Sequence, residues 1–160
     1  MSDNNLKCSE AQMRIRKPAS KVFQAFIDPE VTKYFWFTKG SDKLEVGKKV
    51  TWEWEMYNFS TQVIAKEIVE NQKITVDWFT SEKPTTIDFS FKSLSDDTTY
   101  VSIKHYGFDE TGDQLLLAIK NSTEGFAFVL SGLKAYLEHN INLNLIIDKF
   151  PKELMQQGKE

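Results

Sequence analysis

The sequence predicts an α+β fold in which a curved antiparallel sheet of about six strands wraps around one long C-terminal helix. Between residues 48 and 106, five strand-like segments each place their apolar residues on one face. One long helical segment with a single apolar stripe follows at residues 113–140. The short connections between the strands favour antiparallel order, with one wet face and one buried face. We therefore expect a space between sheet and helix that is lined by aromatic and branched side chains.

The first forty residues predict a strand and two short helices near the N-terminus. Apolar and polar residues alternate over residues 11–15, which is typical of a half-buried strand. Ser20 is expected to cap the first short helix. Asp28 and Pro29 end that helix and begin the second, since Asp caps helices and Pro suits a first helical turn. A polar connection over residues 40–47 leads to the main part of the sheet.

The five sheet strands differ in how clearly they show which face is buried. Residues 50–57 alternate strictly, with two Trp on the apolar face and two Glu on the other. In residues 59–69 the buried face is ambiguous, because Val63 and Ala65 would lie on one face, and Ile64 and Ile68 on the other. The last three strands alternate again, at residues 74–79, 87–92 and 100–105.

The long helix is predicted from an apolar stripe with helical spacing. Asp113 is a plausible N-cap. Gly125 and Gly132 flank the stripe seven residues apart, and each costs about 1 kcal/mol in a helix interior. We therefore expect something to pack closely against that flank. The stripe consists of Leu115, Ile119, Phe126, Leu130, Leu133 and Leu137.

The length of 160 residues fits one domain over residues 1–160. Residues 141–160 form an apolar C-terminal tail, which we expect to pack on the back of the long helix. A dimer contact is the alternative role for this tail. Monomer and homodimer both remain open.

Composition and charge exclude several classes of partner. The 41% hydrophobic and 27% charged residues are ordinary for a soluble globular protein. A net charge of −3 argues against a nucleic-acid partner, which needs a concentrated positive field. We expect no membrane insertion and a cytoplasmic location, because the sequence shows neither a signal peptide nor an apolar run of roughly 20 residues. Cys8 is the single cysteine, so no disulfide, metal site or cofactor is expected.

An aromatic set supplies the candidate ligand-binding residues. Aromatic residues make up 13% of the chain, and they either fill a core or line a pocket. The indole N–H groups of Trp54 and Trp78 need acceptors, which are easier to find beside a pocket than in a dry core. This favours a cavity. The candidate ligand-binding residues are Trp36, Trp54, Trp78, Phe89, Phe91, His105, Phe126 and Leu130.

His105 is the one ionisable residue expected on the buried face. Its position in the alternation places it with Val101 and Ile103. The first interpretation is a structural histidine with both nitrogens hydrogen-bonded, and the alternative is a polar anchor for a ligand. The sequence contains no nucleophile elbow and no glycine-rich phosphate loop, so no catalytic residue is predicted.

Several segments together resemble one known family. The entry pattern is Ile15-x-x-Pro18-x-x-x-Val22-Phe23-x-Ala25-Phe26-x-Asp28-Pro29, and further similar segments are residues 68–78, 100–108 and 124–137. The chain resembles the Hsp90-ATPase-activator-homologue-1-like family of the START-like, SRPBCC, Bet v 1-like superfamily. The resemblance implies the helix-grip fold. Phe126 departs from it, because the family usually has Trp there, and so does the pair Phe35-Trp36, which stands in place of two Trp.

The resemblance implies three candidate functions. Members of the superfamily bind lipids, hormones or other apolar molecules, so the first expectation is binding of a small apolar or amphipathic molecule without chemistry. Phe89, Phe91, Trp78 and Phe126 would then supply contact area, and His105 orientation. A co-chaperone-like interaction module is held lower, because 160 residues leave no room for the second domain of eukaryotic co-chaperones. A pocket enzyme of the cyclase or hydratase type would need a polar dyad inside the pocket.

Overall fold

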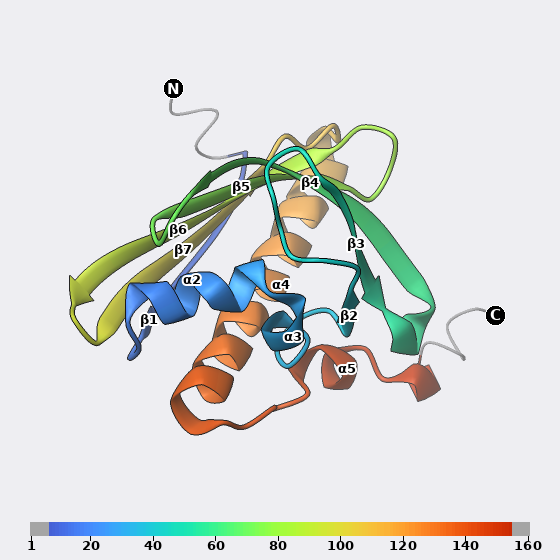
Figure 1. Cartoon of the computed structure of the whole chain (residues 1–160). Helices are drawn as coiled ribbons and strands as arrows, with labels where there is room; N and C mark the ends of the chain where they lie inside the picture. The colour runs from blue at the N-terminus through green and yellow to red at the C-terminus, as the bar shows by residue number, and fades with distance from the viewer. Residues whose placement is uncertain (1–6, 155–160) are drawn as a thin grey trace.

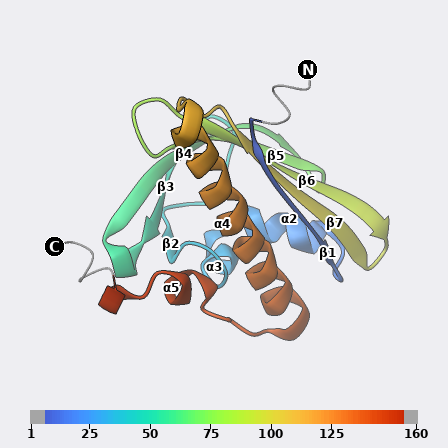
Figure 2. The same ribbon diagram turned by 180° about the vertical axis from the view of Figure 1, so that it is seen from behind.

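The computed structural model describes residues 7–154 and confirms the predicted fold class. Seven antiparallel strands in the order β1-β7-β6-β5-β4-β3-β2 form one sheet, which curls around the long helix α4 (Gly112–His139) (Figure 1). Figure 2 shows α4 crossing the concave side of this sheet. The strands are β1 (Ser9–Ile15), β2 (Lys39–Gly40), β3 (Lys49–Trp54), β4 (Phe59–Val69), β5 (Lys73–Phe79), β6 (Thr85–Ser95) and β7 (Thr98–Tyr106).

The additional strand, β2, lies at the start of the segment predicted as a polar connection. It has two residues, and Lys39 pairs with Glu53 of β3. Such a short strand has no room for an alternating pattern, so the sequence does not reveal it.

The two short helices are α2 (Ala19–Ile27) and α3 (Pro29–Thr32). The expected cap at Ser20 is wrong, because α2 begins at Ala19 after Pro18 and has no side-chain cap hydrogen bond. The cap of α3 is confirmed, since the Asp28 carboxylate accepts a hydrogen bond from the Glu30 amide at 3.0 Å. Val22, Phe23 and Phe26 are among the buried side chains of α2.

Strand β3 ends three residues earlier than the alternation predicts. Glu55–Tyr57 form the short helix η1, and Asn58 follows in the left-handed region with φ of 52°. Asn tolerates this conformation because its short side chain hydrogen-bonds locally. The turn therefore moves Tyr57 off the sheet, where it meets the C-terminal segment.

A β-bulge explains the ambiguous facing of β4. Val63 and Ala65 are buried, and the register with β5 shifts between Ala65 and Glu67. The extra residue of a bulge reverses the alternation, so Ile68 turns toward the core again after it. The facing that buries Val63 and Ala65 is therefore correct before the bulge, and the facing that buries Ile68 is correct after it.

Helix α4 is buried over only half of its length. Its first residue is Gly112 after the N-cap Thr111, so the expected cap at Asp113 is wrong. At the other end Asn140, with φ of 55°, reverses the chain, and its amide donates to the Tyr136 carbonyl at 2.8 Å. No residue of α4 before Phe126 is buried. The buried residues are Phe126, Val129, Leu130, Gly132 and Leu133.

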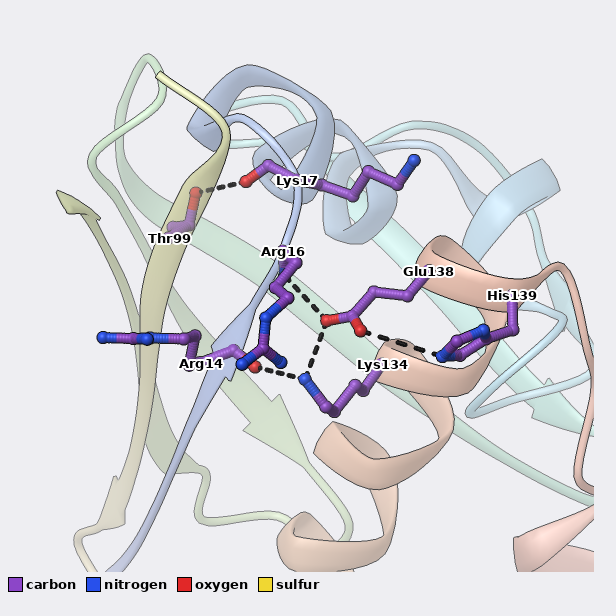
Figure 3. A network of polar contacts seen from close by, with 7 residues as sticks. All are labelled: Arg14, Arg16, Lys17, Thr99, Lys134, Glu138 and His139. Atoms are coloured by element: carbon purple, nitrogen blue, oxygen red, sulfur yellow. Dashed lines mark hydrogen bonds and ion pairs between the residues drawn. The ribbon is translucent and has the colours of Figure 1, made fainter. Parts of the chain in front are cut away.

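Side chains from the end of α4 protect the free edge of β1 (Figure 3). The Arg16 amide donates to the Glu138 carboxylate at 2.7 Å, and Lys134 donates to the Arg14 carbonyl at 3.0 Å. Lys134 and Glu138 also form an ion pair of 2.8 Å. Burial acts to raise the pKa of Glu138, but the hydrogen bonds from Lys134 and the Arg16 amide lower it below its ordinary value. The pair thus satisfies backbone groups that an edge strand would otherwise expose.

Candidate ligand-binding pocket

A pocket of about 330 Å³ lies beneath the less buried half of α4. The sheet, the Phe35-Trp36 segment and the C-terminal segment supply its other walls. Aromatic side chains predominate among the residues that line it. They are Trp36, Trp54, Trp78, His105, Phe108, Ala118, Asn121, Ser122, Gly125, Phe126, Val129, Ile146 and Phe150.

Trp36 stands at the centre of the aromatic cluster. Its ring lies 6.1 Å from Trp78, 6.4 Å from Trp54 and 5.5 Å from Phe126, measured between centroids. It is only 7% exposed, and its ring also lies 6.1 Å from that of Phe89, which does not line the pocket. Trp36 therefore separates the pocket from the packed core.

The sequence favoured a cavity because the indole N–H groups of Trp54 and Trp78 need acceptors, and for Trp78 this reason does not hold. The Trp78 indole N–H donates to the Thr61 hydroxyl at 2.9 Å, so it needs no ligand or water as an acceptor. The cavity results from shape, since the unfilled volume lies under a stretch of α4 that includes Gly125. A Cβ atom added to Gly125 would meet no atom within 4 Å.

His105 forms the polar corner of the pocket. Its Nδ1 shares a hydrogen bond of 2.7 Å with the Ser122 hydroxyl, and its Nε2 shares one of 2.7 Å with the Thr85 hydroxyl. Ser122 in turn shares a hydrogen bond of 2.7 Å with Ser9 on β1. Burial lowers the pKa of His105 to about 4, so the imidazole is neutral at pH 7. Both nitrogens are partnered, as in the structural interpretation, while the ring also borders the pocket.

The candidate residues named from sequence divide into two groups. Trp36, Trp54, Trp78, His105 and Phe126 line the pocket together. Phe89, Phe91 and Leu130 do not line it and are buried in the core instead. Phe26 of α2 fills that region, with ring centroids 4.9 Å from Phe89 and 5.8 Å from Phe91.

Sequence reasoning missed several lining residues. Phe108 follows Gly107, whose φ of 89° ends β7 and turns the chain back over the pocket. The His105 and Phe108 rings lie 4.6 Å apart. Asn121 and Ser122 are polar, so the apolar stripe of the long helix does not include them. The close contact expected beside Gly125 is wrong, because a Cβ atom added there would meet no atom within 4 Å; the expected contact is found only at Gly132, against Phe35.

The C-terminal segment closes one side of the pocket. From Asn140 it runs through the short helix α5 (Leu145–Lys149) to η1. The Tyr57 hydroxyl lies 2.7 Å from the Phe150 carbonyl and 3.2 Å from the Ile146 carbonyl. Lys149 pairs with Glu124 of α4 at 3.1 Å. We name residues 140–154 the C-terminal strap; residues 155–160 of the predicted tail lie outside the described residues.

A second hollow of about 300 Å³ is lined mainly by residues 142–147 of the strap and by residues 33–36. It shares Trp36 and Ile146 with the first pocket, so these two side chains form a partition between the hollows. Lys33 and Glu55 are among its lining residues, so it is the more polar of the two.

The described residues offer little for other kinds of site. No three His, Cys, Asp or Glu side chains within residues 7–154 gather closely enough to hold a metal ion. Burial is the main cause that raises the pKa of the Cys8 thiol. Among the helices of residues 7–154, none combines the length and the apolar character that crossing a bilayer requires.

Comparison with known proteins identifies relatives for most of the chain. The profile of the family described as Activator of Hsp90 ATPase homolog 1-like protein matches residues 16–138. No curated protein matches the chain.

Solved structures share the fold over most of its length. The crystal structure of protein SSP2350 from Staphylococcus saprophyticus is 29% identical, with a TM-score of 0.74, and the match covers 85% of this chain and 95% of that one. The Aha1 dimer from Colwellia psychrerythraea is 20% identical, with a TM-score of 0.69 and coverage of 82% and 96%. The Hsp90 activator PFC0360w from Plasmodium falciparum is 19% identical, with a TM-score of 0.64 and coverage of 82% and 96%.

Proposed function

Since the chain belongs to the family of activator of Hsp90 ATPase homolog 1-like proteins and carries an aromatic pocket, we propose that it binds a small apolar or amphipathic molecule there. The bound molecule leaves the pocket chemically unchanged.

The observation that carries this proposal is the unfilled volume itself. A volume of about 330 Å³ is at the lower end of the roughly 300–1,000 Å³ typical of small-molecule sites. Filling it with apolar atoms removes aromatic surface from water, and this is the main favourable contribution to such binding. The single polar corner at His105 and Ser122 supplies orientation.

The polar corner supports binding more than catalysis. His105 and Ser122 have the spacing of a base and a nucleophile, at 2.7 Å. However, a pKa of about 4 makes the imidazole a weak base at neutral pH. Its other nitrogen meets the Thr85 hydroxyl, which cannot stabilise an imidazolium as a carboxylate does. The cyclase or hydratase alternative therefore has no group of matching basicity among the lining residues.

Intrinsic fluorescence tests the proposal directly, because Trp36, Trp54 and Trp78 line the pocket. We expect an apolar dye or a medium-chain alcohol to change tryptophan emission saturably and to raise the melting temperature, as ligand linkage requires. If no member of a lipid and metabolite panel bound saturably, the result would contradict the proposal.

Gly125→Leu is the matched blocking variant. The leucine side chain enters the open space beside Gly125 and occupies part of the pocket, so we expect affinity to fall by at least about tenfold, or 1.4 kcal/mol. Ala127→Leu is the control, since Ala127 lies on the exposed side of the same helix. Equal affinities for the two variants would place the ligand elsewhere.

The co-chaperone alternative draws on the names of the Aha1 and Hsp90-activator structures, which at 20% and 19% identity share the fold alone. Stimulation of a purified Hsp90-type ATPase by this protein would support that alternative. An unchanged ATPase rate would leave ligand binding as the proposed function.

A further inference from the structure

We propose that the pocket selects an uncharged ligand with a hydroxyl or carbonyl group on an apolar body, in preference to a carboxylate or an ammonium of the same shape. This inference deepens the proposed function and rests on it.

The pocket wall carries no charged side chain. Of the thirteen residues that line it, none is Asp, Glu, Lys or Arg. His105 is the one ionisable member, and burial holds its pKa at about 4, so it brings no positive charge at neutral pH. An anion in this pocket would therefore lose its hydration without meeting a counter-charge.

Two charges beside the pocket, Lys149 of the strap and Glu124 of α4, already pair with each other. Lys149 pairs with Glu124 at 3.1 Å across the gap between α5 and α4. The Lys149 ammonium also lies 5.6 Å from the Phe150 ring, at the rim of the pocket. A carboxylate that approached Lys149 would have to share it with Glu124, and an ammonium that approached Glu124 would have to share it with Lys149, so each ion gains less than it would from an unpaired charge.

The polar corner suits a neutral group that can both donate and accept. Ser122 has one hydrogen and two lone pairs, and its bonds to Ser9 and His105 use two of these three sites. One donor or one acceptor site therefore remains, depending on the tautomer of His105 and on the direction of the bond with Ser9. Asn121, next to Ser122 in the lining, adds an amide that can act in either direction. A ligand hydroxyl satisfies each of these arrangements.

Aromatic rings can attract cations through their faces, so an ammonium is the competing ligand class. The rings of this pocket, however, already meet edge to face. Trp36 and Phe126 are 5.5 Å apart at 70°, Trp36 and Trp78 are 6.1 Å apart at 76°, and Trp78 and Phe126 are 6.2 Å apart at 62°. In such pairs the positive edge of one ring covers the negative face of another, which reduces the attraction for a cation.

A matched series of ligands tests the inference. Decanol, decanoate and decylammonium each have ten carbons and a compact end group, and they differ mainly in the charge of that group. At pH 7.5 we expect decanol to bind at least about tenfold more tightly than either ion, measured by tryptophan fluorescence and checked by calorimetry. Equal or tighter binding of either ion would overturn the inference while leaving the proposed function intact. Failure of all three to bind would overturn both.

Gly125→Lys, with Gly125→Met as its control, provides a second test. Both side chains start in the open space beside Gly125, and only lysine adds a charge. We expect the ratio of decanoate to decanol affinity to rise at least about tenfold in Gly125→Lys and to stay unchanged in Gly125→Met. Circular dichroism confirms that each variant is folded. An unchanged ratio in a folded Gly125→Lys variant would show that the end group does not enter this pocket, and would overturn the inference.

Discussion

The two halves of the space between the sheet and α4 differ in what fills them. On one side of Trp36, α2 inserts Phe23 and Phe26 against β6, and the Phe23 and Phe91 rings meet at 5.7 Å. On the other side the C-terminal strap borders the space with Ile146 and Phe150 without filling it, and a pocket of about 330 Å³ remains beneath α4. The same kinds of side chain thus form a packed core in one half and a lined pocket in the other, because α2 fills the first half whereas the strap only borders the second.

This difference separates stability from binding within one aromatic cluster. Truncating a ring in the packed half removes its contacts and leaves a cavity, which lowers the free energy of unfolding. Rings in the pocket half already face unfilled volume, so their truncation changes binding more than folding. The predictions below test this division, from the largest expected effect to the smallest.

Phe89→Ala should destabilise the protein far more than Phe126→Ala. The two side chains are equally inaccessible, at 1% and 4% exposed, so solvent exposure does not distinguish them. We expect a loss of about 3–5 kcal/mol for Phe89→Ala, and about 2 kcal/mol for Phe126→Ala, whose ring already borders the pocket. Chemical denaturation of the two variants measures both values. Equal losses would show that the pocket half is packed as tightly as the core.

His105 should make stability depend on pH between 6.5 and 4. Its pKa falls from 6.5 to about 4 on folding, so in this interval the unfolded chain binds a proton that the folded chain does not. Stability from this residue is complete above pH 6.5, is lost as the pH falls, and changes no further below about 4. The full loss is on the order of 3 kcal/mol.

Comparison with His105→Gln isolates this contribution, because the acidic residues titrate in both proteins. We expect unfolding free energies of the wild type to fall more steeply from pH 6.5 to 4.5 than those of the variant. An NMR titration adds a direct readout, with the His105 ring signals unchanged down to pH 5. Parallel pH profiles would contradict a neutral buried imidazole.

The two interior glycines of α4 should respond to alanine with opposite signs. At Gly132 an added Cβ would lie 3.2 Å from the Phe35 Cβ and 3.3 Å from the Phe35 carbonyl oxygen, while at Gly125 it would meet nothing within 4 Å. Gly125→Ala should therefore stabilise the protein by about 1 kcal/mol through helix propensity. Gly132→Ala should destabilise it by about 1 kcal/mol or more, because crowding against Phe35 exceeds that gain. Melting curves that shift in the same direction would contradict the contrast.

Tyr57→Phe should have the smallest effect on stability and act mainly on ligand exchange. The variant removes the hydroxyl that holds the strap carbonyls of Phe150 and Ile146, at a cost of about 0.5 kcal/mol, since the bond to Phe150 is exposed. We expect faster dissociation of a bound ligand, measured by stopped-flow fluorescence. Tyr100→Phe is the control, because Tyr100 is 41% exposed on the outer face of the sheet. Identical dissociation rates in both variants would show that the strap does not limit exchange.

The fold was largely predictable because alternation and helical spacing report which side of each element is buried. The departures are local. Bulges, left-handed asparagines and two-residue strands depend on a few atoms and leave no periodic signal, as in β4, at Asn58 and in β2.

The candidate site was predictable only in part. Trp36, Trp54, Trp78, His105 and Phe126 were named from sequence and line one pocket. Phe89 and Phe91 also point to the buried face of the sheet, from β6, but they pack against α2 and do not line the pocket. Ile146 and Phe150 reach the pocket from the C-terminal strap, whose path no pattern in the sequence specifies.

By itself, the amino-acid sequence determined the six longer strands, the long helix, the face that each buries except in β4, and the aromatic character of the space between them. Tertiary structure alone decided which rings pack and which border a pocket, and it made Gly132 a close contact and Gly125 an open space. The physical reason is that periodicity reports the direction of a side chain, whereas filling depends on the distance between two facing surfaces. That distance is set where α2, the C-terminal strap and α4 meet the curved sheet.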